Sequence, residues 1–165
     1  MKELCARLTA LLAEILEVYR TILTLSQRKK DTLIAGQVKE LEEITRQEET
    51  LILQVGRLEK ERQQVMAEIR QVNGLQDEEL TLVQVKDLVD ASTAGRLETG
   101  SEELRSVLRD LKSMNELNTK LLQRAIAFVD FNINVLAQHS VGPVYAAQGQ
   151  NGTSVQERTL VDRKA

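Results

Sequence analysis

The stretch that decides the fold is LCARLTALLAEILEVYRTILTL, residues 4–25. Apolar side chains recur in it at alternating steps of four and three residues, which places them on one face of an α-helix. The first row is Leu4, Leu8, Leu11, Ile15, Val18, Ile22 and Leu25, and the second is Leu12, Leu16, Tyr19 and Leu23. A stripe this broad needs more than one neighbour to cover it. It therefore predicts a bundle helix rather than one half of a two-stranded coiled coil.

Two long helices are predicted first, over residues 2–35 and 37–72. Gly36 separates them, and Asn73-Gly74 ends the second, because these residues tolerate the left-handed conformation found at helix ends. A connection this short predicts an antiparallel hairpin.

The second helix repeats the alternating apolar spacing, but Glu48 and Arg62 occupy two positions of its apolar row. We expect each of these charged side chains to pair with a neighbouring helix or with a bound partner.

A third long helix is predicted over residues 101–138, with Ser101 as its N-cap. Between the hairpin and this helix we expect a short helix over residues 77–90. The small and glycine-containing run 91–100 is predicted to be a flexible connection.

These elements predict an all-α fold, an antiparallel bundle of three long helices with a short connecting helix. Gly142-Pro143 and later glycines stop any periodic pattern. We therefore expect a helical-bundle domain over residues 1–140 and a flexible C-terminal tail over residues 141–165.

Composition argues against several classes of function. The 22 basic and 25 acidic side chains are interspersed and aromatic residues make up only 2%, which disfavours nucleic-acid binding. Cys5 and His139 are the only residues of their types, so a zinc site is not expected. Motifs for nucleotide binding, metalloprotease chemistry or nucleophilic catalysis are absent. We predict no enzyme activity, no catalytic residues, no metal site and no cofactor.

The chain is expected to stay in the cytoplasm. Charges interrupt its N-terminal residues too often for a secretion signal, and no run of 18 apolar residues could insert into a membrane.

Polar residues within the apolar stripe of the third helix are the candidate functional feature. Asn115, Asn118 and Asn132 interrupt this stripe. A buried asparagine often fixes the register of packed helices. The other reading is a groove in which a partner helix docks beside small alanine side chains. The candidate partner-binding residues are Asn115, Asn118, Leu121, Leu122, Ala125, Ile126, Val129, Asn132, Ile133 and Tyr145.

Over residues 4–149 the chain resembles the FlgN family of flagellar type III export chaperones. The resemblance rests on the order of four segments. These are the leucine-rich residues 11–23, the second helix with Glu48-Glu49 and residues 58–62, the run NELNTKLL at 115–122, and YAAQG at 145–149.

The resemblance implies a chaperone that binds the C-terminal helical segments of the hook–filament junction proteins FlgK and FlgL. It would prevent their premature assembly and deliver them to the export gate. It assigns Asn118, Leu121, Leu122, Ala125 and Val129 to cargo binding. It also implies that Tyr145 docks at the gate protein FlhA.

A self-associating coiled-coil scaffold is the alternative interpretation of the same stripes. The chaperone interpretation predicts a monomer or a weak homodimer, whereas a scaffold would form a stable rod. The width of the stripe over residues 4–25 favours the bundle.

Overall fold

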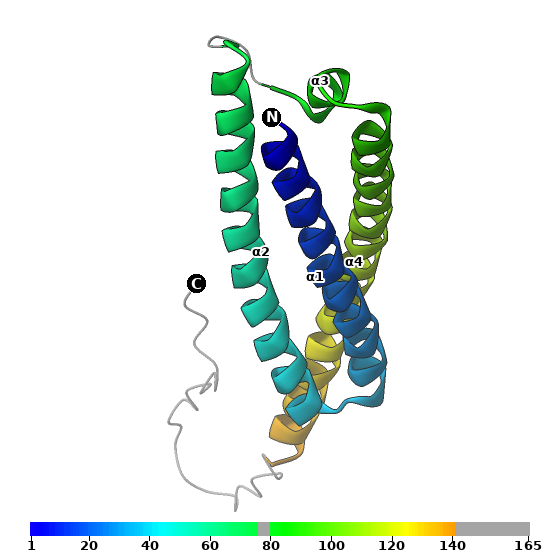
Figure 1. Cartoon of the computed structure of the whole chain (residues 1–165). Helices are drawn as coiled ribbons and strands as arrows, with labels where there is room; N and C mark the ends of the chain where they lie inside the picture. Colours follow the sequence, from blue (N-terminus) through cyan, green and yellow to red (C-terminus); the bar gives the residue numbers. More distant parts are fainter. Residues whose placement is uncertain (76–79, 141–165) are drawn as a thin grey trace, which may run out of the picture. The chain divides into compact units, whose positions relative to one another are not determined.

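The structure, a computed structural model, describes residues 1–75 and 80–140. Over these residues the chain forms four helices and no strand: α1 (Lys2–Ala35), α2 (Val38–Val72), α3 (Leu82–Asp87) and α4 (Ala91–Ser140) (Figure 1). The predicted all-α fold is confirmed. The chain divides into two units, Met1–Val129 and Asp130–Ala165, and α4 continues from the first into the second. The domain boundary predicted after residue 140 stays a prediction, and the predicted tail lies outside the described residues.

Helix α1 carries most of the hydrophobic core, as the breadth of its stripe predicts. Leu8 of the first row is 0% exposed, and Leu12 and Leu16 of the second row are 6% and 5% exposed. Burying each such side chain contributes about 1.5–3 kcal/mol. The core cluster contains Cys5, Leu8, Leu11, Leu12, Ile15, Val18 and Ile22 of α1, Leu58, Val65 and Ile69 of α2, Val85 of α3, and Leu97 and Leu111 of α4.

Polar contacts between helices show in which direction the helices of the first unit run. Between α1 and α2, Arg7 pairs with Glu68 at 4.0 Å and Lys29 with Glu48 at 2.7 Å, so these helices are antiparallel.

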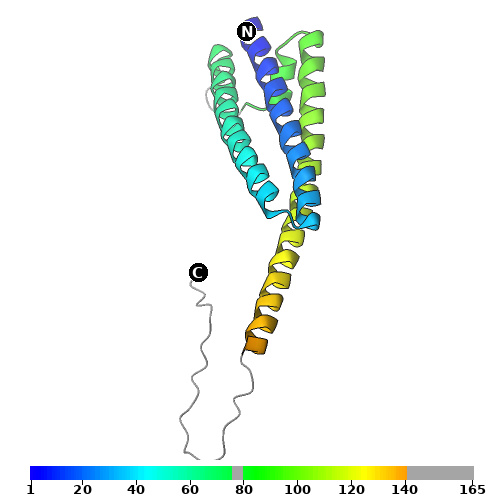
Figure 2. The same ribbon diagram turned by 90° about the horizontal axis from the view of Figure 1, so that it is seen from below.

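Helix α4 also contacts α1, but in the parallel direction. Arg20 pairs with Glu103 at 2.7 Å, and further along both helices Asn118 donates to the carbonyl of Ser26 at 2.8 Å. The three long helices thus alternate in direction: within the described part of the first unit, Figure 2 shows α1 running downwards, α2 upwards and α4 downwards.

The turn between α1 and α2 forms as predicted. Gly36 has a left-handed backbone with φ of 68°, and its N–H donates to the carbonyl of Leu33 at 3.4 Å. A side chain at this position would be strained, which explains the glycine. The second helix begins at Val38, one residue after its predicted start.

The predictions for residues 77–100 need correction. The short helix is Leu82–Asp87 rather than 77–90; residues 77–79 lie outside the described residues. Thr81 starts this helix with a capping box, because its oxygen accepts from the Gln84 N–H while the Gln84 side chain accepts from the Thr81 N–H.

The predicted flexible connection over residues 91–100 is wrong, because α4 begins at Ala91. Asp90 organises this start. Its side chain accepts from the Thr93 N–H at 3.0 Å and from the Thr93 hydroxyl at 2.9 Å. Both bonds lower the pKa of Asp90, and the bond from the Thr93 N–H has the larger effect. Leu97 is fully buried in the core, so packing and capping overcome the helix cost of two glycines, about 1 kcal/mol each.

No helix among the described residues is long and apolar enough to cross a membrane. Within the same part of the chain, no group of three or more His, Cys, Asp or Glu side chains is placed to hold a metal ion.

Candidate partner-binding site

Asn118 joins α4 to α1 through a buried polar contact. It is 5% exposed, and its Nδ2 donates to the carbonyl oxygen of Ser26 at 2.8 Å and to the Ser26 hydroxyl at 3.1 Å. That hydroxyl donates in turn to Oδ1 of Asn115 at 3.0 Å. Sliding α4 along α1 by one turn would break all three bonds. The contact therefore fixes the register of these helices, which agrees with the first of the two interpretations for Asn118.

One atom of this network is unsatisfied. Among the residues that the structure describes, the buried Oδ1 of Asn118 accepts no hydrogen bond. Leaving a buried acceptor unpaired costs about 1–3 kcal/mol. Register alone explains the Nδ2 bonds but gives no reason for keeping the second polar atom buried.

Asn118 also lines a cleft of about 530 Å³ between the three long helices, which we call the turn-side cleft because it lies next to the Gly36 turn. Its lining is Ile22, Lys29 and Leu33 of α1, Leu41, Thr45, Glu48 and Ile52 of α2, and Asn115, Asn118, Thr119 and Leu122 of α4. The volume falls in the range of protein binding sites, and the lining combines apolar and polar groups.

The two charged residues of the turn-side cleft neutralise each other. Nζ of Lys29 donates to the Glu48 carboxylate at 2.7 Å, and Glu48 is 9% exposed. The expectation that Glu48 pairs with a neighbouring helix is confirmed.

Arg62, the other charge in the apolar row of α2, pairs within its own helix. Its guanidinium donates twice to Glu59, at 2.8 and 2.6 Å, and this contact lowers the pKa of the Glu59 carboxyl. The expectation that Arg62 pairs with a neighbouring helix is wrong, because Glu59 lies one helical turn earlier on the same face; pairing with a bound partner stays a prediction.

The other predicted site residues follow the same side of α4. In the first unit Leu121 and Ala125 are half-buried, whereas Ile126 and Val129 are 51% and 53% exposed. The structure thus brings Asn115, Asn118 and Leu122 together in the turn-side cleft. The cleft lining does not include Leu121, Ala125, Ile126 or Val129.

The remaining predicted residues belong to the second unit. Ile133 is 49% exposed and Asn132 is half-buried. Tyr145 lies outside the described residues.

The sequence analysis missed the lining that α1 and α2 contribute. Ser26 could have been noticed, because it follows Ile22 by four residues and so puts a hydroxyl on an otherwise apolar face. Leu33 and Leu41 flank the Gly36 turn, a position that brings both to the same end of the hairpin.

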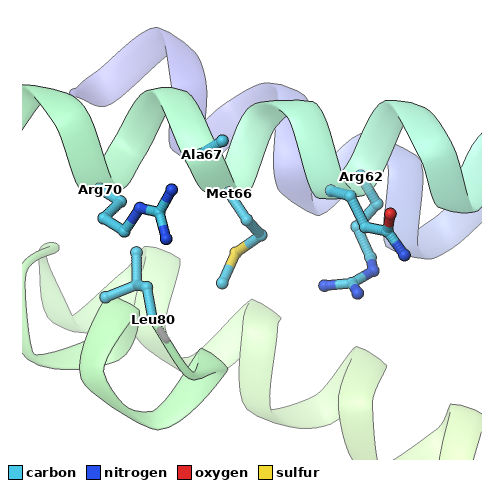
Figure 3. Close-up of a pocket in the computed structure, with 6 residues that line it drawn as sticks. Arg62, Met66, Ala67, Arg70 and Leu80 are labelled. Carbon is cyan, nitrogen blue, oxygen red and sulfur yellow. The ribbon is translucent and has the colours of Figure 1, made fainter. Parts of the chain in front are cut away.

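A smaller hollow of about 240 Å³ lies where α2 passes Leu80, two residues before α3 begins. Figure 3 shows Arg62, Met66 and Arg70 of α2 on the side that faces Leu80. The guanidinium of Arg62 is already bound to Glu59, and the volume is less than half that of the turn-side cleft. Of these two hollows, the turn-side cleft is the stronger candidate for recognising a partner, because it contains predicted site residues and the smaller hollow contains none.

A protein-family model described as "FlgN protein" matches residues 1–153. No curated protein and no solved structure matches the chain.

Proposed function

Since the chain belongs to the FlgN family of flagellar export chaperones, we propose that it binds the C-terminal helical segments of FlgK and FlgL in the cytoplasm. Binding keeps these hook–filament junction proteins from assembling early, and the complex then travels to the export gate. The role is that of a chaperone and involves no catalysis.

The observation that carries the choice of a helical cargo is the apolar surface of α4 beside the turn-side cleft. Leu122, Ile126 and Val129 are between 41% and 53% exposed and follow one another at spacings of four and three residues. An amphipathic helix of a partner covers such a row with its own apolar face. A cargo segment that self-assembles through that face would be masked while it is bound.

Release at the export gate requires that binding be reversible. The polar groups of the turn-side cleft suit this requirement. A cleft lined only by apolar side chains would favour a permanent complex, and the polar groups reduce its apolar contact area. For the gate itself we propose an FlhA-like partner and a role for Tyr145; this assignment rests on the family resemblance of residues 145–149.

The direct test is calorimetry of the full chain with the C-terminal segment of FlgK, and separately of FlgL, with the mass of each complex measured by light scattering. We expect a one-to-one complex. The substitution Val129→Asp should weaken it at least about tenfold, because a carboxylate would be buried against apolar cargo.

Two results would overturn the proposal. One is the absence of binding to both segments by a chain that circular dichroism shows to be helical. The other is a stable dimer of the chain that Val129→Asp dissociates, which would support the self-associating scaffold instead.

A further inference from the structure

The starting point is the unsatisfied acceptor of the turn-side cleft. The Nδ2 of Asn118 is held by Ser26, so the Oδ1 on the other side of the amide points away from those bonds. The side chain lines the cleft and is 5% exposed, and no described residue donates to Oδ1. A hydrogen bond to this atom would contribute more binding free energy than one to a surface acceptor, because a surface acceptor is already hydrogen-bonded to water.

The walls around this acceptor combine apolar with polar side chains and are balanced in charge. Ile52 of α2 is 59% exposed and Leu122 of α4 is 41% exposed, so both offer apolar area to a partner. Lys29 and Glu48, the charged residues of the lining, are bound to each other. A complementary partner therefore carries apolar side chains and no net charge where it enters the cleft.

We infer that the turn-side cleft receives one amphipathic helix of the cargo, and that this helix places an uncharged hydrogen-bond donor opposite Asn118. The donor is the side chain of a Ser, Thr, Asn or Gln within the apolar row of that helix. This inference rests on the proposed chaperone function and adds the place and the chemistry of cargo selection.

The donor must come from a side chain because the backbone N–H groups inside a helix are already bonded to its own carbonyls. It must be uncharged because a lysine or arginine buried there would meet only an amide oxygen, and Glu48 is already paired with Lys29. A wholly apolar helix would fill the cleft but leave Oδ1 unpaired. The acceptor thus discriminates between cargo helices of similar apolar pattern.

Binding also has to move Asn118. Its Oδ1 is covered in the unbound chain, so the donor reaches it only when this side chain changes its rotamer or α4 shifts slightly against α1. The bonds to Ser26 resist that movement, which keeps the complex reversible.

The first experiment measures where the cargo binds. The full chain is titrated by calorimetry with the FlgK C-terminal segment, using Ile52→Glu and Leu122→Glu as cleft variants. Their matched controls are Leu53→Glu, on α2 and 71% exposed, and Leu117→Glu, on α4 and 41% exposed, because neither residue lines the cleft. We expect a loss of affinity of about tenfold or more for both cleft variants and of less than about twofold for the controls.

The second experiment identifies the donor. Asn118→Leu is combined with segments in which each Ser, Thr, Asn and Gln is changed in turn to alanine. One such change in the segment should weaken its binding to the unsubstituted chain about 3- to 10-fold. The same change should leave its affinity for the Asn118→Leu variant unaltered. Circular dichroism and urea denaturation verify that each variant is folded.

The outcomes separate the two proposals. If the unsubstituted chain binds neither segment, the chaperone function fails and this inference fails with it. If the segment binds but cleft and control variants weaken it equally, or no cargo residue couples to Asn118, only the present inference is overturned. A cleft variant that changes the self-association of the chain and leaves cargo affinity unchanged also overturns it.

Discussion

The two ends of the helical bundle differ in what they bury. At the end where α1 begins, the core is mostly apolar: Leu8, Val65, Ile69, Val85 and Leu97 are all fully buried, and Thr93 is the buried polar residue among the described ones there. We call these residues the apolar end. Towards the Gly36 turn, the buried side chains include Ser26, Thr32, Glu48 and Asn118, which we call the polar end.

With recognition placed at the turn-side cleft, as we propose, this difference separates stability from recognition within one bundle. Apolar burial contributes most of the free energy of folding and is indifferent to the identity of a partner. Buried polar groups contribute little net stability, but they impose register and reject partners that cannot satisfy them. The turn-side cleft lies at the polar end, where we propose that the bundle recognises its partner.

The apolar end should be the more sensitive to truncation. Leu8→Ala removes a fully buried side chain from the core, and we expect it to lower the free energy of unfolding by about 2–5 kcal/mol. Urea denaturation followed by circular dichroism measures this. A loss below about 1 kcal/mol would mean that the apolar end is not the stable part of the bundle.

At the polar end the contact between α1 and α2 depends on balanced charge. Lys29→Met leaves the Glu48 carboxylate nearly buried and unpaired, which should cost about 1–2 kcal/mol in the same urea assay. The double variant Lys29→Met, Glu48→Met should recover most of this loss because no charge remains. A double variant no more stable than Lys29→Met would contradict the pairing.

Asn118→Leu sharpens the contrast between stability and recognition. It breaks the bonds to Ser26 but also removes the unsatisfied Oδ1, so we expect the free energy of unfolding to change by less than about 1 kcal/mol in either direction. The same substitution should weaken cargo binding measurably. A destabilisation as large as that of Leu8→Ala would assign Asn118 to the structural core instead.

A substitution at the start of α4 should have the smallest effect on stability, and this effect should depend on pH. The bonds from Thr93 lower the pKa of Asp90, so the ionised carboxylate stabilises the fold above the ordinary aspartate pKa of about 4. This contribution is lost as the pH falls through the lowered pKa of the folded chain.

Asp90→Ala should therefore lower the melting temperature by roughly 2–4 °C at pH 7. The difference in melting temperature between the variant and the unsubstituted chain should shrink as the pH falls below the ordinary aspartate pKa of about 4 and through the lowered pKa of Asp90. Asp87→Ala is the control, because Asp87 is exposed and the Thr93 bonds go to Asp90. A difference that stays constant down to low pH would show that the Asp90 carboxylate is not what starts the helix.

How far the sequence predicts this molecule depends on the range of the interactions involved. The broad stripe of α1 and the left-handed turn at Gly36 arise from local spacing and backbone geometry, so both were predictable. Residues 91–100 were not, because their small side chains and two glycines indicate a loop when taken alone. Only the packing of Leu97 against distant core residues, together with the Asp90 cap, makes them helical.

The candidate site shows the same limit. Asn118 is visible in the sequence as a polar interruption of an apolar row, and the structure confirms that it is buried. Its partner Ser26 and the cleft residues Ile52 and Leu33 lie on other helices, and periodicity does not reveal which helices meet or in what register. The unsatisfied Oδ1 is a property of the packed bundle and has no counterpart in the sequence.

The most direct test of recognition at the polar end is hydrogen–deuterium exchange of the full chain, followed by mass spectrometry, with and without the FlgK C-terminal segment. We predict slower exchange on binding in peptides that cover residues 41–52 and 115–126, and little change in peptides that cover the apolar end. Protection confined to the apolar end, or absent from both polar-end peptides in a saturated complex, would contradict the assignment of recognition to the turn-side cleft.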